Sequence, residues 1–162
     1  MPCTCSQYPA PELSRASIKK RLKATPAILK QLVLLAENEA AGIKLLRCPH
    51  CAQYWQTGRE WHLGNDEYVY HVPAIEIADW QEEPYMQPAA WMIYGAMMGP
   101  YYAKNTFEPS DKPCRVAGCP NQAIKLSGVC EPHHIEQLQQ FGLLPKRPAG
   151  RLFAPYVATA PA

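Results

Sequence analysis

The sequence has little that would suit a membrane protein or a long helical assembly. Its uncharged apolar stretch, 91–103, is shorter than the ~20 residues that cross a bilayer, and it contains two glycines and a proline. We therefore expect a buried segment there and no membrane span. The 17 prolines, roughly twice the usual share of about 5%, divide the chain into short elements, which makes helical bundles and coiled coils poor candidates.

The motifs of the common enzyme classes are also missing. The sequence contains no GxSxG, no Walker phosphate-binding loop and no GxGxxG, and no His-x-Glu precedes a Pro-Cys-x-x-Cys as it does in deaminases. The carboxylate pair Glu82 and Glu83 is typical of a solvated turn. The start, Met1–Cys5, has neither the basic nor the apolar segment of a secretion signal, which favours a cytoplasmic protein. We expect a protein without catalytic activity.

Charge is arranged in blocks, although the formal net charge is only +2. Residues 12–30 carry six Lys or Arg and a single acid, Glu12. Residues 60–83 carry seven acids and no Lys or Arg, and residues 112–151 turn basic again. A total near zero with an acidic middle third counts against nucleic acid as the main partner.

Seven cysteines without a secretion signal indicate metal ligation, because cytosolic thiols are kept reduced. The C-terminal cluster is complete in itself, with three thiolates from Cys114, Cys119 and Cys130 and a histidine shortly after them. Tetrahedral zinc takes four such ligands, so we predict a structural zinc ion there. We take His133 as the fourth ligand, while His134 is compatible with the same helical start.

The remaining four cysteines make a second tetrahedral set: Cys3, Cys5 and the knuckle Cys48-Pro-His-Cys51. We predict that all four hold a second structural zinc ion. Two alternatives stay open. Either no metal binds there, or Cys3 and Cys5 belong to a frayed terminus and a histidine completes the site, namely His50, His62 or His71. A redox role is disfavoured, because a thioredoxin-type CxxC precedes a helix and the residues after Cys51 are strand-like.

Hydrophobic periodicity predicts an α+β fold built from short elements. One helix is expected over 14–24, and a second from Thr25-Pro26 to Gly42, which is the strongest helical pattern in the sequence. Strand-like residues at 54–55 and 68–72, with turns at Gly58 and at 64–66, predict an antiparallel hairpin of the zinc-ribbon kind. Further helices are expected over 89–98 and 131–141.

These elements suggest three parts. Residues 1–110 would hold the helical pair, the zinc-ribbon-like module and a segment rich in aromatic residues and methionine. Residues 111–144 would hold the C-terminal zinc knuckle and its helix, and residues 145–162 a Pro- and Ala-rich extended tail. Zinc can contribute ~10 kcal/mol or more of folding free energy per site, which would offset such a turn-rich chain.

The segment from Cys114 to His133 resembles the CxxxGC…CxxH zinc knuckles of small bacterial and phage proteins, some of them attached to HNH-type nucleases. The nuclease pattern also needs a catalytic His followed by an Asn and a second His, and this chain has neither after His134. The resemblance therefore implies metal binding without nuclease activity.

The segment from Leu46 to Trp55 is similar to the CxxCxxYW knuckle of small bacterial zinc-ribbon proteins, among them candidate immunity proteins of toxin systems. This similarity implies a non-catalytic protein that works by binding.

The acidic block beside the uncharged aromatic segment suits a basic protein partner, for example a nuclease toxin. We expect Glu82 and Glu83 at the rim of that interface and Tyr85 and Trp91 as its apolar anchors. An alternative is a nucleic-acid-binding regulator that uses the basic helix and the basic C-terminal zinc module. A third possibility is a metal-dependent hydrolase or nuclease relative, which requires a coordination position open to water.

Overall fold

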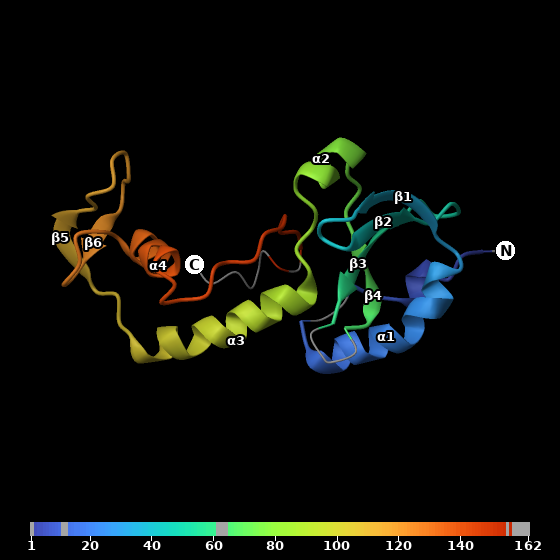
Figure 1. Cartoon of the computed structure of the whole chain (residues 1–162), viewed down its shortest axis with the longest axis horizontal. Coiled ribbons are helices and arrows are strands. Elements are labelled where there is room, and N and C mark those ends of the chain that lie inside the picture. Colours follow the sequence, from blue (N-terminus) through green and yellow to red (C-terminus); the bar gives the residue numbers. More distant parts are fainter. Residues whose placement is uncertain (1, 11–12, 61–64, 155, 157–162) are drawn as a thin grey trace. The chain divides into compact units, whose positions relative to one another are not determined.

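A computed structural model of the chain describes residues 2–10, 13–60, 65–154 and 156, and it divides the chain into two units. The first unit comprises Met1–Met92 with Pro148–Ala162, and the second comprises Ile93–Arg147. The elements are those of an α+β protein, which confirms the predicted fold class (Figure 1).

The first unit is built on an antiparallel sheet in which neighbours in sequence are neighbours in space, β1-β2-β3-β4. The strands are β1 (Val33–Asn38), β2 (Ile43–Arg47), β3 (Tyr54–Arg59) and β4 (Glu67–Val72). The predicted hairpin is present as β3 and β4, in a continuous register from Tyr54 opposite Val72 to Arg59 opposite Glu67. Helix α1 (Arg15–Leu29) contacts β4, and the short α2 (Ile77–Glu82) contacts β1, so the two helices border opposite edges of the sheet (Figure 1).

The predicted pair of N-terminal helices is wrong, because α1 runs through Thr25-Pro26 and the chain then enters β1. Thr25 does not start a new helix. Its hydroxyl donates to the Arg21 carbonyl oxygen at 2.9 Å and accepts from the Val69 N–H at 3.2 Å, which ties α1 to β4.

The helix prediction after Pro26 is wrong because the apolar residues there fit the periodicity of a helix and also that of a strand. Pairing with β2 decides the outcome, at the cost of leaving Val33 and Leu34 47% and 55% exposed. Gly42 was expected to end a helix, and it occupies the tight turn between β1 and β2 with φ +65°. A glycine with positive φ is expected both at the end of a helix and in a tight turn between strands. Only the pairing of β1 with β2 shows which of the two is present.

Gly58 was predicted to form a turn, and it lies instead inside β3 opposite Tyr68. A Cβ atom at this position would come within 3.1 Å of the rings of both Tyr68 and Tyr70. The glycine is needed because two buried tyrosines cross the strand here.

The core of the first unit contains a fully satisfied polar side chain, Gln56. Its Oε1 accepts from the Trp80 Nε1–H at 2.7 Å and from the Tyr85 backbone N–H at 3.0 Å. Its Nε2 lies 2.8 Å from the Tyr85 carbonyl oxygen and 2.5 Å from the Tyr70 hydroxyl. This network fixes α2 and the segment after it on the sheet.

Part of the C-terminal segment belongs to the first unit. Arg151 donates its N–H to the Pro84 carbonyl and accepts from the Met86 N–H, and both distances are at or below 3.0 Å. Gly150 permits this approach, because a Cβ there would lie 2.7 Å from the Met86 Cα. Phe153 and Tyr156 are buried next to it.

The second unit holds the end of α3 (Pro88–Lys104), the strand pair β5 (Pro109–Pro113) and β6 (Gln122–Ile124), and α4 (Glu131–Gln140). Helices predicted over 89–98 and 131–141 are confirmed, although α3 continues through Pro100. Pro100 deprives the Ala96 carbonyl of its helical donor, and Ala96 is exposed, so water can take that place. Among the described residues, no helix combines the length and the apolar character that a bilayer span requires.

Candidate metal centres

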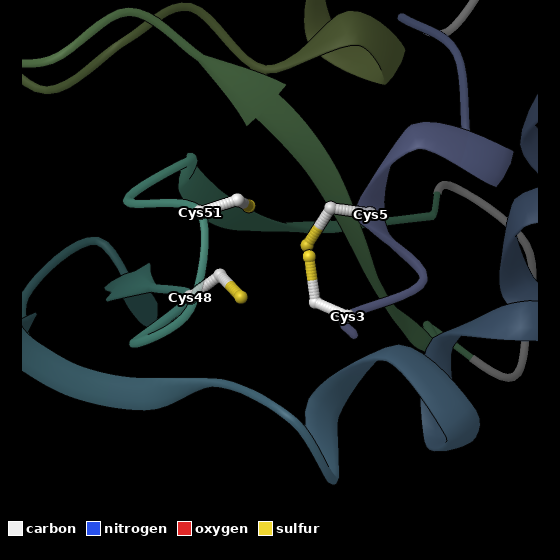
Figure 2. A group of neighbouring side chains, drawn as sticks. All are labelled: Cys3, Cys5, Cys48 and Cys51. Carbon is white, nitrogen blue, oxygen red and sulfur yellow. The ribbon is translucent and has the colours of Figure 1, made fainter. Parts of the chain in front are cut away.

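The first cysteine cluster joins the start of the chain to the sheet. Cys3 and Cys5 come from the N-terminal segment and its single turn of 3-10 helix, Cys5–Gln7, and Cys48 and Cys51 come from the turn between β2 and β3. The four Sγ atoms lie within 4.8 Å of one another. Figure 2 shows the four side chains turned toward one common space.

Local backbone geometry places the two knuckle thiols. The Cys48 N–H donates to the Gln53 carbonyl at 2.9 Å, and Ala52, with φ +60°, returns a hydrogen bond to the Cys48 carbonyl at 3.0 Å. Burial opposes ionisation of Cys48, but the backbone N–H groups of Cys51 and His50 outweigh it and lower the pKa of Cys48 to about 7. A turn that aims N–H groups at a sulfur stabilises the thiolate that a metal requires.

The N-terminal thiols are held by packing and by one side chain. Gln31 accepts from the Thr4 backbone N–H at 3.0 Å and donates to the Thr4 hydroxyl at 2.8 Å. Cys5 and Cys48 are buried in one apolar cluster with Trp55, and burial raises the pKa of Cys5 far above its usual value. This segment is therefore docked, which favours the set of four cysteines over the alternative with a frayed terminus.

Of the three histidines considered for this site, the two that the structure describes, His50 and His71, do not join it. His50 is exposed and is not part of the donor group, and the His71 ring packs edge-on against Trp55 with a centroid distance of 3.9 Å. His62 lies outside the described residues. The CxxC pair stands between two strands, so the helix that a thioredoxin-type site needs is not there.

The second cluster lies within the second unit. Cys114 follows β5, Cys119 lies in the loop before β6, Cys130 caps α4, and His133 sits in the first turn of that helix. The four donor atoms lie within 4.8 Å of one another. The Sγ atoms of Cys119 and Cys130 are 3.7 Å apart, which matches the edge of about 3.8 Å expected for a tetrahedron with ~2.3 Å zinc–sulfur bonds.

Backbone hydrogen bonds shape this cluster as they shape the first. Cys114 donates to the Asn121 carbonyl at 3.0 Å, and the Cys130 N–H points at the Cys114 Sγ at 3.3 Å. Burial works against the Cys114 thiolate, yet the N–H groups of Val116 and Cys130 lower the pKa of Cys114 to about 6. Gly118, with φ +76°, provides the left-handed residue in the loop.

The geometry distinguishes the two adjacent histidines. His133 directs Nδ1 toward Cys114 Sγ at 3.4 Å and toward Cys130 Sγ at 3.2 Å. His134 lies 3.2 Å from the Tyr101 hydroxyl through its Nε2, and its ring adjoins Phe107. His133 is therefore the fourth donor, and His134 anchors α4 to α3 within the second unit.

Both clusters can hold a metal ion, and their donors are soft. Thiolate and imidazole ligands at tetrahedral spacing suit zinc and other late transition metals, whereas magnesium and calcium prefer oxygen. Each set offers four protein donor atoms, the number that a structural zinc site uses.

The residues predicted to bind a partner are only partly on the surface. Tyr85 and Trp91 are 5% and 7% exposed, so these two anchors lie in the core of the first unit. Glu82 and Glu83 are exposed, and Glu83 is 3.8 Å from Arg151.

Sequence reasoning missed the strand that extends this acidic region. Glu37 on β1 is exposed, and its carbonyl accepts from the Gln81 side chain of α2 at 3.0 Å. The apolar residues exposed on the same two elements are Ile77, Val33 and Leu34. The sequence around Glu37 was interpreted as helix, and it contains no local pattern that predicts the contact between Glu37 and α2.

Comparisons with known proteins give this chain no relative: no protein family, no curated protein and no solved structure matches it.

Proposed function

We propose that the protein is a non-catalytic zinc protein that acts by binding a basic protein partner. Zinc is the metal that the donor sets favour, since four cysteines, or three cysteines with one histidine, are its usual structural ligands. A hydrolytic zinc ion keeps one coordination position for water, whereas each cluster here offers four protein donors, enough to fill a tetrahedral site. The metal ions then stabilise the fold, and the surface carries out the function.

One observation supports the choice of partner. An acidic surface is exposed on α2, on the two residues that flank it and on β1, and it is defined here as Glu37, Glu76, Asp79, Glu82 and Glu83. Among the described residues, no Lys or Arg forms an ion pair with Glu76, Asp79 or Glu82. Unpaired carboxylates around exposed apolar side chains give a negative rim and an apolar centre, which attracts and seats a positively charged protein.

The apolar centre differs from the one expected from sequence. Ile77 is 45% exposed on α2 and Leu34 is 55% exposed on β1, whereas Tyr85 and Trp91 are buried in the core. Among basic proteins, we favour a toxin that the protein holds inactive, because the segment from Leu46 to Trp55 resembles zinc ribbons of the immunity type.

The test compares three forms of the zinc-loaded protein as bait in the native extract. One is the wild type, the second carries Glu76→Gln, Asp79→Asn and Glu82→Gln, and the third carries Glu108→Gln, Asp111→Asn and Glu136→Gln. The third form loses as much charge, from exposed acids of the second unit. We expect the wild type and the third form to retain the same strongly basic protein and the second form to lose it.

Raising the salt concentration should release the captured protein, because the rim acts through exposed charges. Equal capture by all three forms would contradict the proposal, and so would the absence of any specific basic protein. An Ile77→Ser variant tests the apolar centre separately, and we expect weaker capture at every salt concentration.

A further inference from the structure

Helix α1 carries a basic surface that the proposed protein-binding site does not use. Lys19, Lys20 and Lys23 are all exposed, and the described residues place no carboxylate in an ion pair with any of them. The sequence from Leu13 to Ala36 contains no acid at all. Lys19 and Lys23 are one helical turn apart, about 6 Å, with Lys20 beside them.

A hollow of about 460 Å³ adjoins Lys20 on this helix. One wall is the N-terminal segment from Gln7 to Ala10. The other is formed by Ser14, the residue before α1, and by α1 itself, where Ser17 and Lys20 contribute polar groups. The volume lies within the range of about 300–1,000 Å³ that small ligands occupy in proteins. Lys20 therefore belongs both to the basic surface and to the hollow.

An aromatic ring is fixed in the wall of this hollow. The Tyr8 ring stands 6.5 Å from Trp55 in an edge-to-face arrangement, and the Arg21 guanidinium lies over it at 5.9 Å. Arg21 is itself buried and donates to the Val69 carbonyl oxygen at 3.4 Å, so this cation is part of the framework. Tyr8 is only half-buried, which leaves part of the ring available to a ligand.

We propose that α1 and the hollow bind single-stranded nucleic acid. Phosphate groups would lie along Lys19, Lys20 and Lys23, and one unstacked base would enter the hollow beside Tyr8. Basic residues next to an aromatic platform are the usual means of binding single strands. A duplex offers the same phosphates but keeps its bases inside the stack, so the hollow favours a single strand. RNA and DNA share this chemistry.

This site is independent of the acidic surface. Helix α1 contacts β4, whereas the acidic surface lies on α2 and β1 at the other edge of the same sheet. Failure of either proposal leaves the other intact, because each is tested with variants that the other does not touch.

The test is fluorescence anisotropy with labelled oligothymidylate, oligouridylate and a mixed duplex of equal length, using the full-length zinc-loaded protein. Three phosphate contacts predict that the logarithm of the binding constant falls with the logarithm of salt concentration with a slope of about −2. The two single strands should bind more tightly than the duplex. Whichever of them binds better identifies RNA or DNA as the source.

Two variants assign the binding to this surface. The triple variant Lys19→Gln, Lys20→Gln and Lys23→Gln should weaken binding by roughly tenfold and flatten the salt dependence. Tyr8→Leu keeps an apolar contact with Trp55 and should weaken single-strand binding by about fivefold or more, with an unchanged salt slope. The matched control, Lys104→Gln, Lys112→Gln and Lys146→Gln, removes equal charge from exposed lysines of the second unit and should bind as the wild type does.

Three results would overturn the proposal. The first is no binding to any oligonucleotide at low salt. The second is an equal loss in the control and in the α1 variant, which would show only a diffuse charge effect. The third is duplex binding as tight as single-strand binding, which would remove the role of the hollow.

Discussion

Nδ1 of His133 lies 3.2 Å from the Sγ atom of Cys130, three positions earlier at the start of α4. The next residue, His134, faces the Tyr101 hydroxyl instead. One helix start thus separates a metal donor from a packing residue, and the two can be tested against each other.

Replacing His133 with Ala should remove one metal ion, whereas His134→Ala should keep both. Native mass spectrometry of the wild type should show two zinc ions, since each cluster offers a complete set of four donors. His134→Ala should lower stability modestly, because it breaks the contact with Tyr101 without touching the ion. Two ions in both variants, or one ion in the His134 variant, would contradict the assignment of His133.

The metal clusters were the part of the site that sequence could predict. Ligand spacing is local in the second cluster, where Cys114 and His133 are only 19 positions apart, and tetrahedral chemistry limits the choices. For the first cluster the argument was arithmetic, because four cysteines remained after the other four donors were assigned. Counting can suggest that Cys3 and Cys48 meet, but only the fold can bring them together.

The first strand shows where local sequence was not enough. The pattern from Ile28 to Ala36 fits a helix, and nothing within the segment reveals that β2 pairs with it. This difference also affects the proposed binding surface. With residues 33–38 assigned to a helix, the sequence cannot place Glu37 beside Gln81 of α2, and it predicts the apolar anchors at Tyr85 and Trp91 instead.

Removing the N-terminal thiols should loosen the start of the chain and leave the second unit intact. In the variant Cys3→Ser and Cys5→Ser, one zinc ion should be lost and the thermal midpoint of the first unit should fall. An ion held by all four thiolates would join the segment before α1 to the β2–β3 turn. The equivalent change in the knuckle, Cys48→Ser and Cys51→Ser, should have the same effect. Combining both changes should add little.

A much larger fall of the thermal midpoint in the four-serine variant than in either double variant would contradict a shared ion, because additive effects indicate that the two cysteine pairs stabilise the unit independently. The metal content of the second cluster is the control. It should stay at one ion per chain in all three variants.

Gln56→Leu should destabilise the first unit by about 3 kcal/mol, because it leaves the Trp80 Nε1–H and the Tyr85 backbone N–H buried without acceptors. Urea unfolding followed by tryptophan fluorescence measures this change in the free energy of unfolding. Gln81→Leu is the matched control in the same unit. Its side chain makes one exposed hydrogen bond, to Glu37, and the expected loss is below about 1 kcal/mol. Equal effects of the two variants would show that the Gln56 network adds nothing specific.

His71 should make the first unit less stable in mild acid. Burial first, and the nearby Arg21 charge second, lower the pKa of His71 to about 4. In the unfolded chain His71 takes up a proton near the usual histidine pKa of about 6.5. In the folded chain it does so only at lower pH. The contribution of neutral His71 to the free energy of unfolding is therefore fully present above the pKa of the unfolded chain. It is lost as the pH falls toward the pKa of the folded chain, at roughly 1 kcal/mol per pH unit.

His71→Phe should remove this loss, because the ring keeps its edge-on contact with Trp55 but cannot take up a proton. The variant should be at least as stable as the wild type at neutral pH, since Nε2 of His71 is buried and the described residues offer it no hydrogen-bond partner. The measurement is the difference in unfolding free energy between the two proteins at each pH, because acid release of zinc affects both and cancels in the difference. If the difference in unfolding free energy stays constant from neutral pH down to about pH 4, the fold does not lower the pKa of His71, and the prediction is wrong.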